Sequence, residues 1–542
     1  MFYAILFIYI PLLLKILFSV SRVDRFLRFI PLVIGKFEYF LAPLRDKPIA
    51  ICLVIYSGWR FSHEGFELYS LLYAVFAALS FLNLFHRYRF RLALCRWVLT
   101  QDSVEPRQFF QIYDRCLGSF SFQIPDHAQR VNYSYVDYRT GNAPHQTLLP
   151  LFQGLIDTAT LAKLAIFAMR KLPHPQGMDA FDAFARIWGV RFVQRARLKL
   201  NTTGVETMPP LSGKVLLVFN HKSHLDFALN FFALGNLRNG SRHLRPRFIA
   251  AKDHFIDNPI IYSFLGLGKC IEKAGMIFIN RQKGKGWLAM QEAAQKLTES
   301  DVEVAVYPQG TRAWGLLDEK NRRTDAGYYT TFTSKKFQEM RGHLKSGTAQ
   351  LILDAALLLR EKGEKSLSVL FVGIDGTATV APKGSFKIQT ESVVTFHVNE
   401  CWRFELPHLI PFENPKGSAS HTEAHENYLD EIEAIHQSID RKLQRSIARH
   451  TLLIDRVLND PRISKPDKVY LEAFLKRADE TENVIPFVTL DRLYALPHEQ
   501  WASSLEHFTQ LVKSSAEEES YKELIRKISS ALIESEQKNK KK

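Results

Sequence analysis

A histidine and an aspartate five residues apart, His221 and Asp226, could carry out acid–base chemistry. They follow an apolar, β-branched run at 215–219, which predicts a buried strand, and precede an apolar run of helical length at 227–234. The point where a strand ends and a helix begins is a common site position in open α/β sheets. If the chain turns between the two residues, the carboxylate can reach the imidazole, fix its tautomer and make it a general base. Taken alone, such a pair is more often structural.

Two arginines follow further apolar runs and could hold an anion. Arg281 ends a run that begins at Gly275, and Arg312 follows a run and turn that begin at Glu303. Guanidinium groups bind phosphate through paired hydrogen bonds. A histidine–aspartate base beside two arginines would suit a substrate that carries a phosphate and a hydroxyl to be deprotonated. Structural ion pairs are the alternative for both arginines.

The surrounding sequence alternates between short apolar runs and helical patterns. This alternation predicts an α/β fold with a mostly parallel mixed sheet flanked by helices. An amphipathic helix is expected over 180–199. The expected strands are 198–205, 214–219, 247–252, 275–281, the start of 303–312, and 366–375. Because parallel strands end along one edge of a sheet, the histidine, the aspartate and both arginines are expected at that edge.

Three sequence blocks in this region resemble ordered blocks of the glycerolipid acyltransferases, the family of glycerol-3-phosphate and 1-acylglycerol-3-phosphate acyltransferases. The blocks are Asn220-His221-x-Ser223-x-x-Asp226, Gly275-x-x-Phe278-x-x-Arg281 and Tyr307-Pro-Gln-Gly-Thr-Arg312. Ala251-Lys252 before the second block and Lys345-Ser-Gly347 after the third also resemble family features. The resemblance covers about residues 178–410. Any one block is weak, but three in order within one α/β domain are specific.

The resemblance implies acyl transfer from acyl-CoA or acyl-carrier protein to the hydroxyl of a glycerophosphate, in the acyltransferase fold. By the same resemblance His221 would be the catalytic base and Asp226 would orient it. The acceptor phosphate would be bound by Arg281, Gln309, Gly310, Thr311 and Arg312. Supporting positions would be Asn220, Ser223, Lys252, Gly275, Phe278 and Lys345. Neither a covalent intermediate, a metal nor another cofactor is expected.

Three features depart from the family pattern and bear on the acceptor. Gln309 stands where the family usually has glutamate, the strand at 369–374 lacks the usual neighbouring proline, and 313–344 form a long basic and aromatic connection. The sequence between His221 and Asp226 favours glycerol-3-phosphate, whereas Gly-Thr-Arg312 favours 1-acylglycerol-3-phosphate, which we predict. Glycerol-3-phosphate or another lysophospholipid is the alternative. A membrane-anchored, lipid-binding scaffold with a decayed site is the alternative of another class.

The composition indicates an anionic partner. The 542-residue chain has a formal net charge of +15 and a pI of about 9.4. Its first hundred residues hold 12 Lys and Arg against 5 Asp and Glu, set beside apolar segments rather than in a basic groove. This distribution favours membrane lipids over nucleic acid. The scattered cysteines form no CxxC pair and argue against a zinc site or disulfide framework; they are Cys52, Cys95, Cys116, Cys270 and Cys401.

The first hundred residues also carry apolar segments that predict integral membrane attachment. Residues 1–20 and 68–85 are long enough to span a bilayer or nearly so, whereas 48–59 is short. Basic stretches on both sides of 48–85 predict, by the positive-inside rule, a hairpin that enters the membrane from the cytoplasmic side. The hairpin could span or re-enter, and a buried hairpin of a soluble protein is the alternative. The catalytic domain is expected on the cytoplasmic side.

The sequence divides into four expected regions. Residues 1–100 would be membrane-anchoring helices, 101–177 a connecting subdomain with a helix over 148–172, and 178–410 the acyltransferase domain. The remainder, 411–542, would form a helical C-terminal region, because no glycine follows Gly417 and prolines divide it into short helical patterns. These patterns are at 423–447, 469–478 and 521–534.

Overall fold

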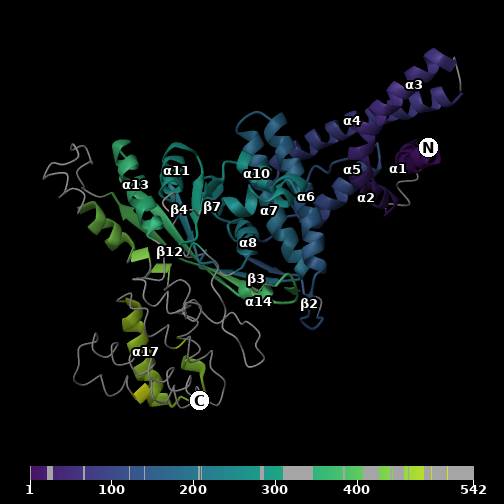
Figure 1. Ribbon diagram of the computed structural model, residues 1–542. Coiled ribbons are helices and arrows are strands. Elements are labelled where there is room, and N and C mark those ends of the chain that lie inside the picture. Colours follow the sequence, from purple (N-terminus) through teal and green to yellow (C-terminus); the bar gives the residue numbers. More distant parts are fainter. Residues whose placement is uncertain are drawn as a thin grey trace, which may run out of the picture. The chain divides into compact units, whose positions relative to one another are not determined.

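The computed structural model contains two compact units (Figure 1). One unit comprises residues 1–131 and 157–191, and the other comprises 132–156 and 192–542. The structure describes residues 2–20, 29–64, 68–120, 123–139, 141–205, 208, 210–221, 223–280, 286–308, 310, 346–381, 385–406, 427–436, 438–439, 442–443, 454, 457–461, 463–480, 490 and 509–510.

The first unit is helical. Its elements are α1 (Phe2–Val20), α2 (Phe29–Leu44), η2 (Arg45–Ile49), α3 (Ala50–Glu64), α4 (Leu68–Leu99), α5 (Pro106–Gly118), and parts of α6 (Leu149–Lys171) and α7 (Gln176–Ala196). The hairpin expected from the sequence is formed by α3 and α4, although α4 continues well past residue 85. By length and composition, α4 and α6 could cross a membrane, and α1 is a shorter apolar helix.

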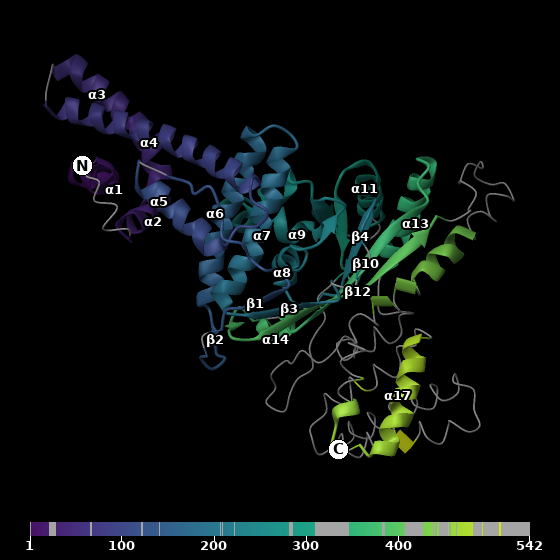
Figure 2. The same ribbon diagram turned by 180° about the vertical axis from the view of Figure 1, so that it is seen from behind.

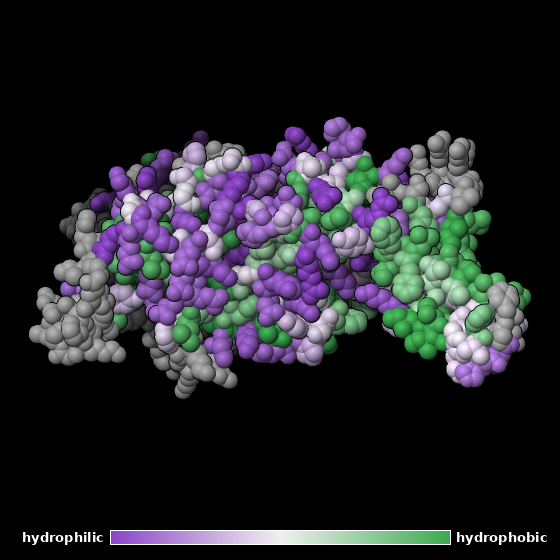
Figure 3. All heavy atoms as spheres, turned by 90° about the horizontal axis from the view of Figure 1, so that it is seen from above, coloured by the Kyte–Doolittle hydropathy of each residue, from purple (hydrophilic) through white to green (hydrophobic). Residues whose placement is uncertain are grey.

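This unit exposes many large apolar side chains and buries several charged ones. Large apolar side chains such as Phe7, Phe40 and Phe85 are exposed along α1, α2 and α4. Figure 3 shows apolar side chains gathered over the part of the molecule formed by α3 and α4. Lys15 and Asp46 are instead buried in the interior. The interior also holds an apolar cluster that includes Leu12, Leu53 and Phe76. Exposed apolar side chains together with paired, buried charges are the arrangement expected of helices in lipid.

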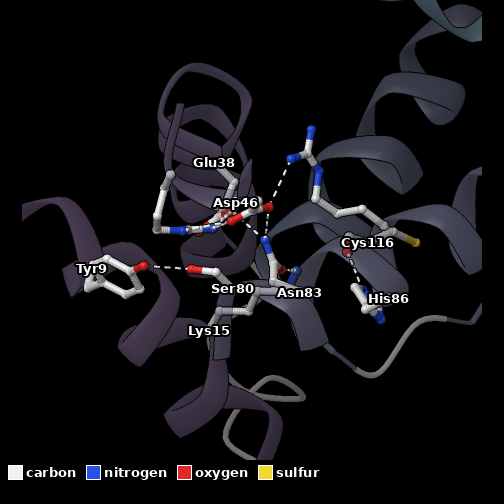
Figure 4. Close-up of polar contacts among 10 residues, drawn as sticks. Tyr9, Lys15, Glu38, Asp46, Ser80, Asn83, His86 and Cys116 are labelled. Atoms are coloured by element: carbon white, nitrogen blue, oxygen red, sulfur yellow. Dashed lines mark hydrogen bonds and ion pairs between the residues drawn. The ribbon is translucent and has the colours of Figure 1, made fainter. Parts of the chain in front are cut away.

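A buried network of charged and amide groups joins four elements of this unit (Figure 4). Arg45 of η2 donates two hydrogen bonds, of 3.0 and 2.8 Å, to the carboxylate of Glu38 on α2. The carboxylate of the neighbouring Asp46 accepts hydrogen bonds from Asn83 and Arg87 on α4, at 2.7 and 3.0 Å. The remaining link is to α1, because Lys15 donates to Asn83 Oδ1 at 2.6 Å. Each of these groups therefore has a partner although water is excluded.

The second unit is built on an eight-stranded, mostly parallel sheet (Figures 1 and 2). In spatial order the strands are β1 (Tyr135–Asp137), β3 (Lys199–Thr203), β12 (Val393–Glu405), β10 (Ser366–Asp375), β4 (Val215–Phe219), β9 (Glu303–Val306), β7 (Pro246–Ala251) and β8 (Ile277–Ile279). Strands β10, β4, β9, β7 and β8 run parallel, whereas β12 and β1 make antiparallel pairs. The predicted fold class is confirmed.

Helices pack on the sheet because successive apolar side chains of its strands point to opposite faces, which makes both faces apolar. Val218 and Val306 contribute to the core on the face covered by α11 (Gly286–Glu299) and α13 (Gly347–Glu361). Phe219, one residue on, points to the opposite face and contacts Phe248. The other helical elements are α8 (Asp226–Ala233), α9 (Lys252–Phe255), η3 (Ile260–Phe264), α10 (Leu267–Lys273) and α14 (Thr377–Val380).

The C-terminal region packs on the same core. Its described helix, α17 (Lys465–Glu480), contributes Leu471 and Leu475 to the cluster that contains Ile352 of α13. Tyr428 donates a hydrogen bond of 2.7 Å to Asp354 on α13. The expected helices at 423–447 and 469–478 are therefore helical where the structure describes them, and 521–534 lies outside the described residues.

The division between the two units falls inside α7. Helix α7 begins in the helical unit and ends in the sheet unit, so no break occurs near its start. Residues 132–156 belong to the sheet unit, because β1 pairs with β3 and β2 (Gln146–Thr147) pairs with β11 (Ile388–Gln389). Pairings between distant segments thus set the division.

We predict opposite effects for alanine at two helical glycines of the first unit. A Cβ at Gly35 would lie 2.1 Å from the carbonyl oxygen of Asp114, so Gly35→Ala must push α2 and α5 apart and should lower stability by about 1–3 kcal/mol. Gly58 has open space around its Cβ position, so Gly58→Ala should raise stability by about 0.5–1 kcal/mol through helix propensity. Thermal unfolding of both variants in detergent measures this. Equal changes would show that α2 and α5 do not approach as described.

Candidate active site

The loop between β4 and α8 is fixed by a buried asparagine. Asn220, the first residue after β4, donates a hydrogen bond of 2.8 Å to the Ile374 carbonyl oxygen, and its Oδ1 accepts one of 2.6 Å from the Ile374 N–H. The side chain thus pairs with the end of β10 as a strand backbone would. This holds the start of the loop at the carboxyl edge of the sheet.

His221 and Asp226 form a hydrogen-bonded pair in this loop. The two are joined by a bond of 2.9 Å between His221 Nδ1 and Asp226 Oδ2. The same oxygen accepts the backbone N–H of Ser223 at 2.9 Å, so it is an acceptor and Nδ1 carries the proton. Nε2 is then the basic nitrogen. The carboxylate is fully buried whereas the imidazole is partly exposed, so the pair can take a proton from a substrate hydroxyl.

The Ser223 hydroxyl makes two hydrogen bonds that hold the loop between β4 and α8. It donates to the Ala381 carbonyl oxygen at 3.0 Å and accepts the N–H of Leu225 at 3.2 Å. Since Ala381 follows α14, the loop is tied to the segment after β10 as well as to β10 itself. The expected supporting positions Asn220 and Ser223 therefore hold the backbone that carries the base.

Tyr307, which the sequence did not single out as a site residue, stacks on the imidazole. The ring centroids of His221 and Tyr307 are 4.4 Å apart and the planes are 28° from parallel. Asn230 of α8 donates a hydrogen bond of 2.8 Å to the Tyr307 hydroxyl. Phe219 and Phe248 contact the Tyr307 ring, which fixes its position. The only sequence signal was an aromatic residue directly before the Pro-Gln-Gly turn.

Burial keeps the tyrosine neutral. It raises the pKa of Tyr307 well above the usual range, and the negative charge of Asp226 raises it further. The phenol therefore cannot act as a base near neutral pH. Its contribution is a flat, uncharged surface that orients the imidazole.

The neighbouring strand ends carry two more expected residues. Val218 of β4 pairs with Val306 of β9, which sets the turn 307–310 beside His221. The N–H of Gly310 donates a hydrogen bond of 3.0 Å to the Tyr307 carbonyl oxygen, so the chain makes a tight turn here. Gly310 has φ of +65°, a conformation that favours glycine. Lys252 is exposed at the end of β7, on the same edge.

The second sequence block is only partly at this edge. Gly275 lies at the amino end of β8, opposite the edge that carries His221, and has φ of +77°. Its carbonyl oxygen accepts a hydrogen bond of 2.6 Å from Lys296, so it serves a structural turn. Phe278 lies within β8 and is half-buried. The expected phosphate-binding residues Arg281, Gln309, Thr311 and Arg312, and the supporting Lys345, lie outside the described residues.

The side chains of the described residues offer no metal site. Among them, no group of three or more His, Cys, Asp or Glu side chains is arranged to hold an ion. The chemistry that the described site supports is general-base catalysis by an oriented imidazole.

Part of the chain is similar to known proteins. Residues 199–359, from the first residue of β3 into α13, match the family model described as Acyltransferase. This part of the chain is therefore similar to the acyltransferase family, in agreement with the resemblance of its sequence blocks. Among solved structures it is similar to the 1-acyl-sn-glycerophosphate (LPA) acyltransferase PlsC from Thermotoga maritima, at 17% identity and a TM-score of 0.30, over 53% of this chain and 98% of that one. No curated protein matches the chain significantly.

We predict that substitutions of Tyr307 separate catalysis from stability. Tyr307→Leu removes the stacking on His221 and should lower kcat about tenfold and change the pH profile of kcat/KM, since an aromatic pair contributes about 0.5–1.5 kcal/mol. Tyr307→Phe keeps the ring but leaves the Asn230 amide without its partner, so it should lower the melting temperature while kcat stays within a few-fold.

The double variant Tyr307→Phe/Asn230→Leu is the matched control, because removing both hydrogen-bonding groups should restore much of the lost stability. An unchanged kcat and pH profile in Tyr307→Leu would show that the ring does not position the base.

Proposed function

We propose that this protein is a membrane-bound acyltransferase that moves a fatty acyl group from acyl-CoA or acyl-carrier protein to the hydroxyl of 1-acylglycerol-3-phosphate, forming phosphatidic acid. The observation that carries the proposal is the His221–Asp226 pair at the carboxyl end of a central strand, inside a domain that matches the acyltransferase family model. An oriented base with an accessible nitrogen suits deprotonation of a hydroxyl nucleophile.

In the proposed reaction, His221 Nε2 takes the proton of the acceptor hydroxyl while the hydroxyl oxygen attacks the thioester carbonyl carbon. The tetrahedral intermediate expels the thiolate, which receives the proton from the imidazolium. Asp226 stabilises the imidazolium through the 2.9 Å bond to Nδ1, and the Tyr307 ring holds the imidazole plane. The ester and a free thiol are the products, so neither an oxidant nor a covalent enzyme intermediate is needed.

The acceptor phosphate is proposed to bind beside the turn at Gly310. The sequence places Thr311 and Arg312 directly after this glycine, and Arg281 two residues after the end of β8. Since β9, β7 and β8 are parallel neighbours, both arginines follow strand ends on the edge that carries His221. Guanidinium groups there would bind a phosphate dianion through paired hydrogen bonds.

Membrane attachment is proposed for residues 1–100, with the catalytic unit on the cytoplasmic side. Support comes from the length and apolar composition of α4 and from the exposed apolar side chains along α1 to α4. The basic stretches that flank 48–85 favour the cytoplasmic side for both ends of the hairpin. Attachment would bring the enzyme to an acceptor that is itself a membrane lipid.

Replacing the base tests the reaction. His221→Ala should lower transfer from acyl-CoA by about 10²–10⁴-fold. It should also lower the melting temperature, because the fully buried carboxylate of Asp226 loses a hydrogen-bond partner. The assay uses full-length protein in lipid nanodiscs with labelled acyl-CoA and a panel of 1-acylglycerol-3-phosphate, glycerol-3-phosphate and other lysophospholipids. His224→Ala is a matched control, since that imidazole is exposed one residue after Ser223. Near-normal turnover in His221→Ala would remove this residue from the mechanism.

Gln309 should tune the acceptor rather than disable the enzyme. A glutamine keeps the carbonyl acceptor of the family's glutamate but not its charge, which leaves the crevice more electropositive and favours a dianionic phosphate. Gln309→Glu is therefore expected to change KM for the phosphorylated acceptor, with transfer present in both forms.

Two other results would contradict this role of Gln309. If the native protein is inert with every acceptor and Gln309→Glu restores transfer, the native chain is a lipid-binding scaffold. If the two proteins behave identically, position 309 does not contact the acceptor.

A further inference from the structure

The edge of the sheet that carries His221 also carries large exposed apolar side chains on both sides of it. Strands β10, β4, β9, β7 and β8 are neighbours in that order and run parallel, so their carboxyl ends share one edge. His221 follows β4, inside this row. The chain segments that leave β7 and β8 lie on one side of it, and those that leave β10 lie on the other.

The first group of side chains follows β7 and β8. Phe264 of η3 is 76% exposed, and Ile260 is exposed one turn earlier in η3. Trp287 and Leu288, at the start of α11, are about half exposed. This group is anchored near the site, because Phe255 just before η3 contacts the ring of Phe227, the residue after Asp226.

The second group follows β10. Phe386 is 77% exposed between α14 and β11. Pairing of β11 with β2 brings this segment to the start of α6, where Leu149 and Phe152 are also exposed. The segment is tied to the site by the hydrogen bond from Ser223 to Ala381, five residues before Phe386.

Six side chains of these two groups form what we call the apolar rim: Ile260, Phe264, Trp287, Leu149, Phe152 and Phe386. Four strand spacings, roughly 20 Å, separate β10 from β8, and His221 follows a strand that lies between them. Exposed, large apolar side chains along one edge of the sheet indicate a surface that contacts another protein or a membrane. A rigid protein seated on both groups would close access to His221, whereas a fluid bilayer would not.

The composition of the rim also favours lipid. Its second group opens α6, a helix long and apolar enough to cross a membrane. Three of the six side chains are phenylalanine and one is tryptophan, which suit the boundary between headgroups and acyl chains. Exposed charges near the first group are mixed, with Lys252 and Lys269 beside Asp253 and Asp257. Insertion would therefore depend on apolar contact and not on anionic headgroups.

We propose that the carboxyl edge of the sheet docks into a lipid bilayer through the apolar rim, so that an acceptor held in the membrane reaches His221 without crossing water. The docking is a separate contact from the helices at 1–100. The part that concerns acceptor delivery rests on the proposed function, whereas the bilayer contact does not.

Quenching by brominated lipids tests the contact directly. Full-length protein is placed in phosphatidylcholine vesicles with or without bromine on the acyl chains, and tryptophan emission is compared between the native chain and Trp287→Phe. The emission component lost in Trp287→Phe should be quenched by brominated lipid, with no requirement for anionic lipid or low salt. An unquenched Trp287 component overturns the docking, whatever the enzyme's activity.

Two double variants test delivery: Phe264→Ser/Trp287→Ser for the first group and Phe152→Ser/Phe386→Ser for the second. Each should lower kcat/KM at least about tenfold for a long-chain acceptor held in the vesicle. The serine side chains lack the favourable free energy that large apolar side chains gain when they move from water into the bilayer. Activity toward a short-chain, water-soluble 1-acylglycerol-3-phosphate should stay unchanged. Tyr470→Ser, on the exposed face of α17, is the matched control and should affect neither acceptor.

Three results would overturn the proposal of delivery. Equal losses with both acceptors would mean that the rim supports the fold or the chemistry. Unchanged activity with the membrane-held acceptor would mean that the rim is not used. Crosslinking of two chains through rim positions, lost in the variants, would identify a second copy as the occupant. If the native protein transfers to neither acceptor, the proposed function fails, and the quenching result still decides the docking.

Discussion

The geometry of the candidate site depends on one buried carboxylate. Asp226 Oδ2 accepts hydrogen bonds from His221 Nδ1 and from the Ser223 N–H, so a single oxygen sets both the tautomer of the imidazole and the shape of the loop. A buried negative charge costs free energy unless it is paired and hydrogen-bonded. The loop is therefore held on both sides, by Asn220 to β10 and by the Ser223 hydroxyl to the segment after α14. The base is positioned by backbone contacts that do not depend on substrate.

Both units have an apolar core and pair the polar groups that they bury. In the sheet unit, Asn220, Ser223 and Asp226 are buried at the site. In the helical unit, Lys15 and Asp46 belong to an interior network that joins the helices, while many large apolar side chains are exposed. This difference in exposure fits the lipid surroundings proposed for the helical unit, where polar groups must find partners inside the protein.

In the sheet unit, the candidate site and several exposed apolar side chains lie at the same edge of the sheet. Parallel strands deliver their loops to one side, so the residues that do chemistry and the exposed residues of η3 and α11 share that side. The same arrangement leaves Gly275 on the other side, where it serves a turn held by Lys296. Position along a strand thus separates residues that can meet a substrate from residues that shape the fold.

The sequence by itself predicted the strands around the site and the His221–Asp226 pair. The period and length of apolar runs are local properties, and two residues only five positions apart can adopt few relative positions, so both could be predicted from neighbouring residues. It also predicted the α3–α4 hairpin from its apolar segments, although not the continuation of α4 to Leu99. The family match over 199–359 confirms what the three sequence blocks indicated.

Only the tertiary structure showed what surrounds the base. Tyr307 and Asn230 are 77 residues apart, and Asn220 and Ile374 are 154 apart, so their contacts depend on which strands lie side by side. The order β10-β4-β9 brings them together, and nothing in the local pattern of any one strand specifies that order. The division between the units also depends on such pairings, because those of β1 with β3 and of β2 with β11 assign 132–156 to the sheet unit. Local periodicity specifies elements, whereas their pairing follows from the burial of apolar faces over the whole chain.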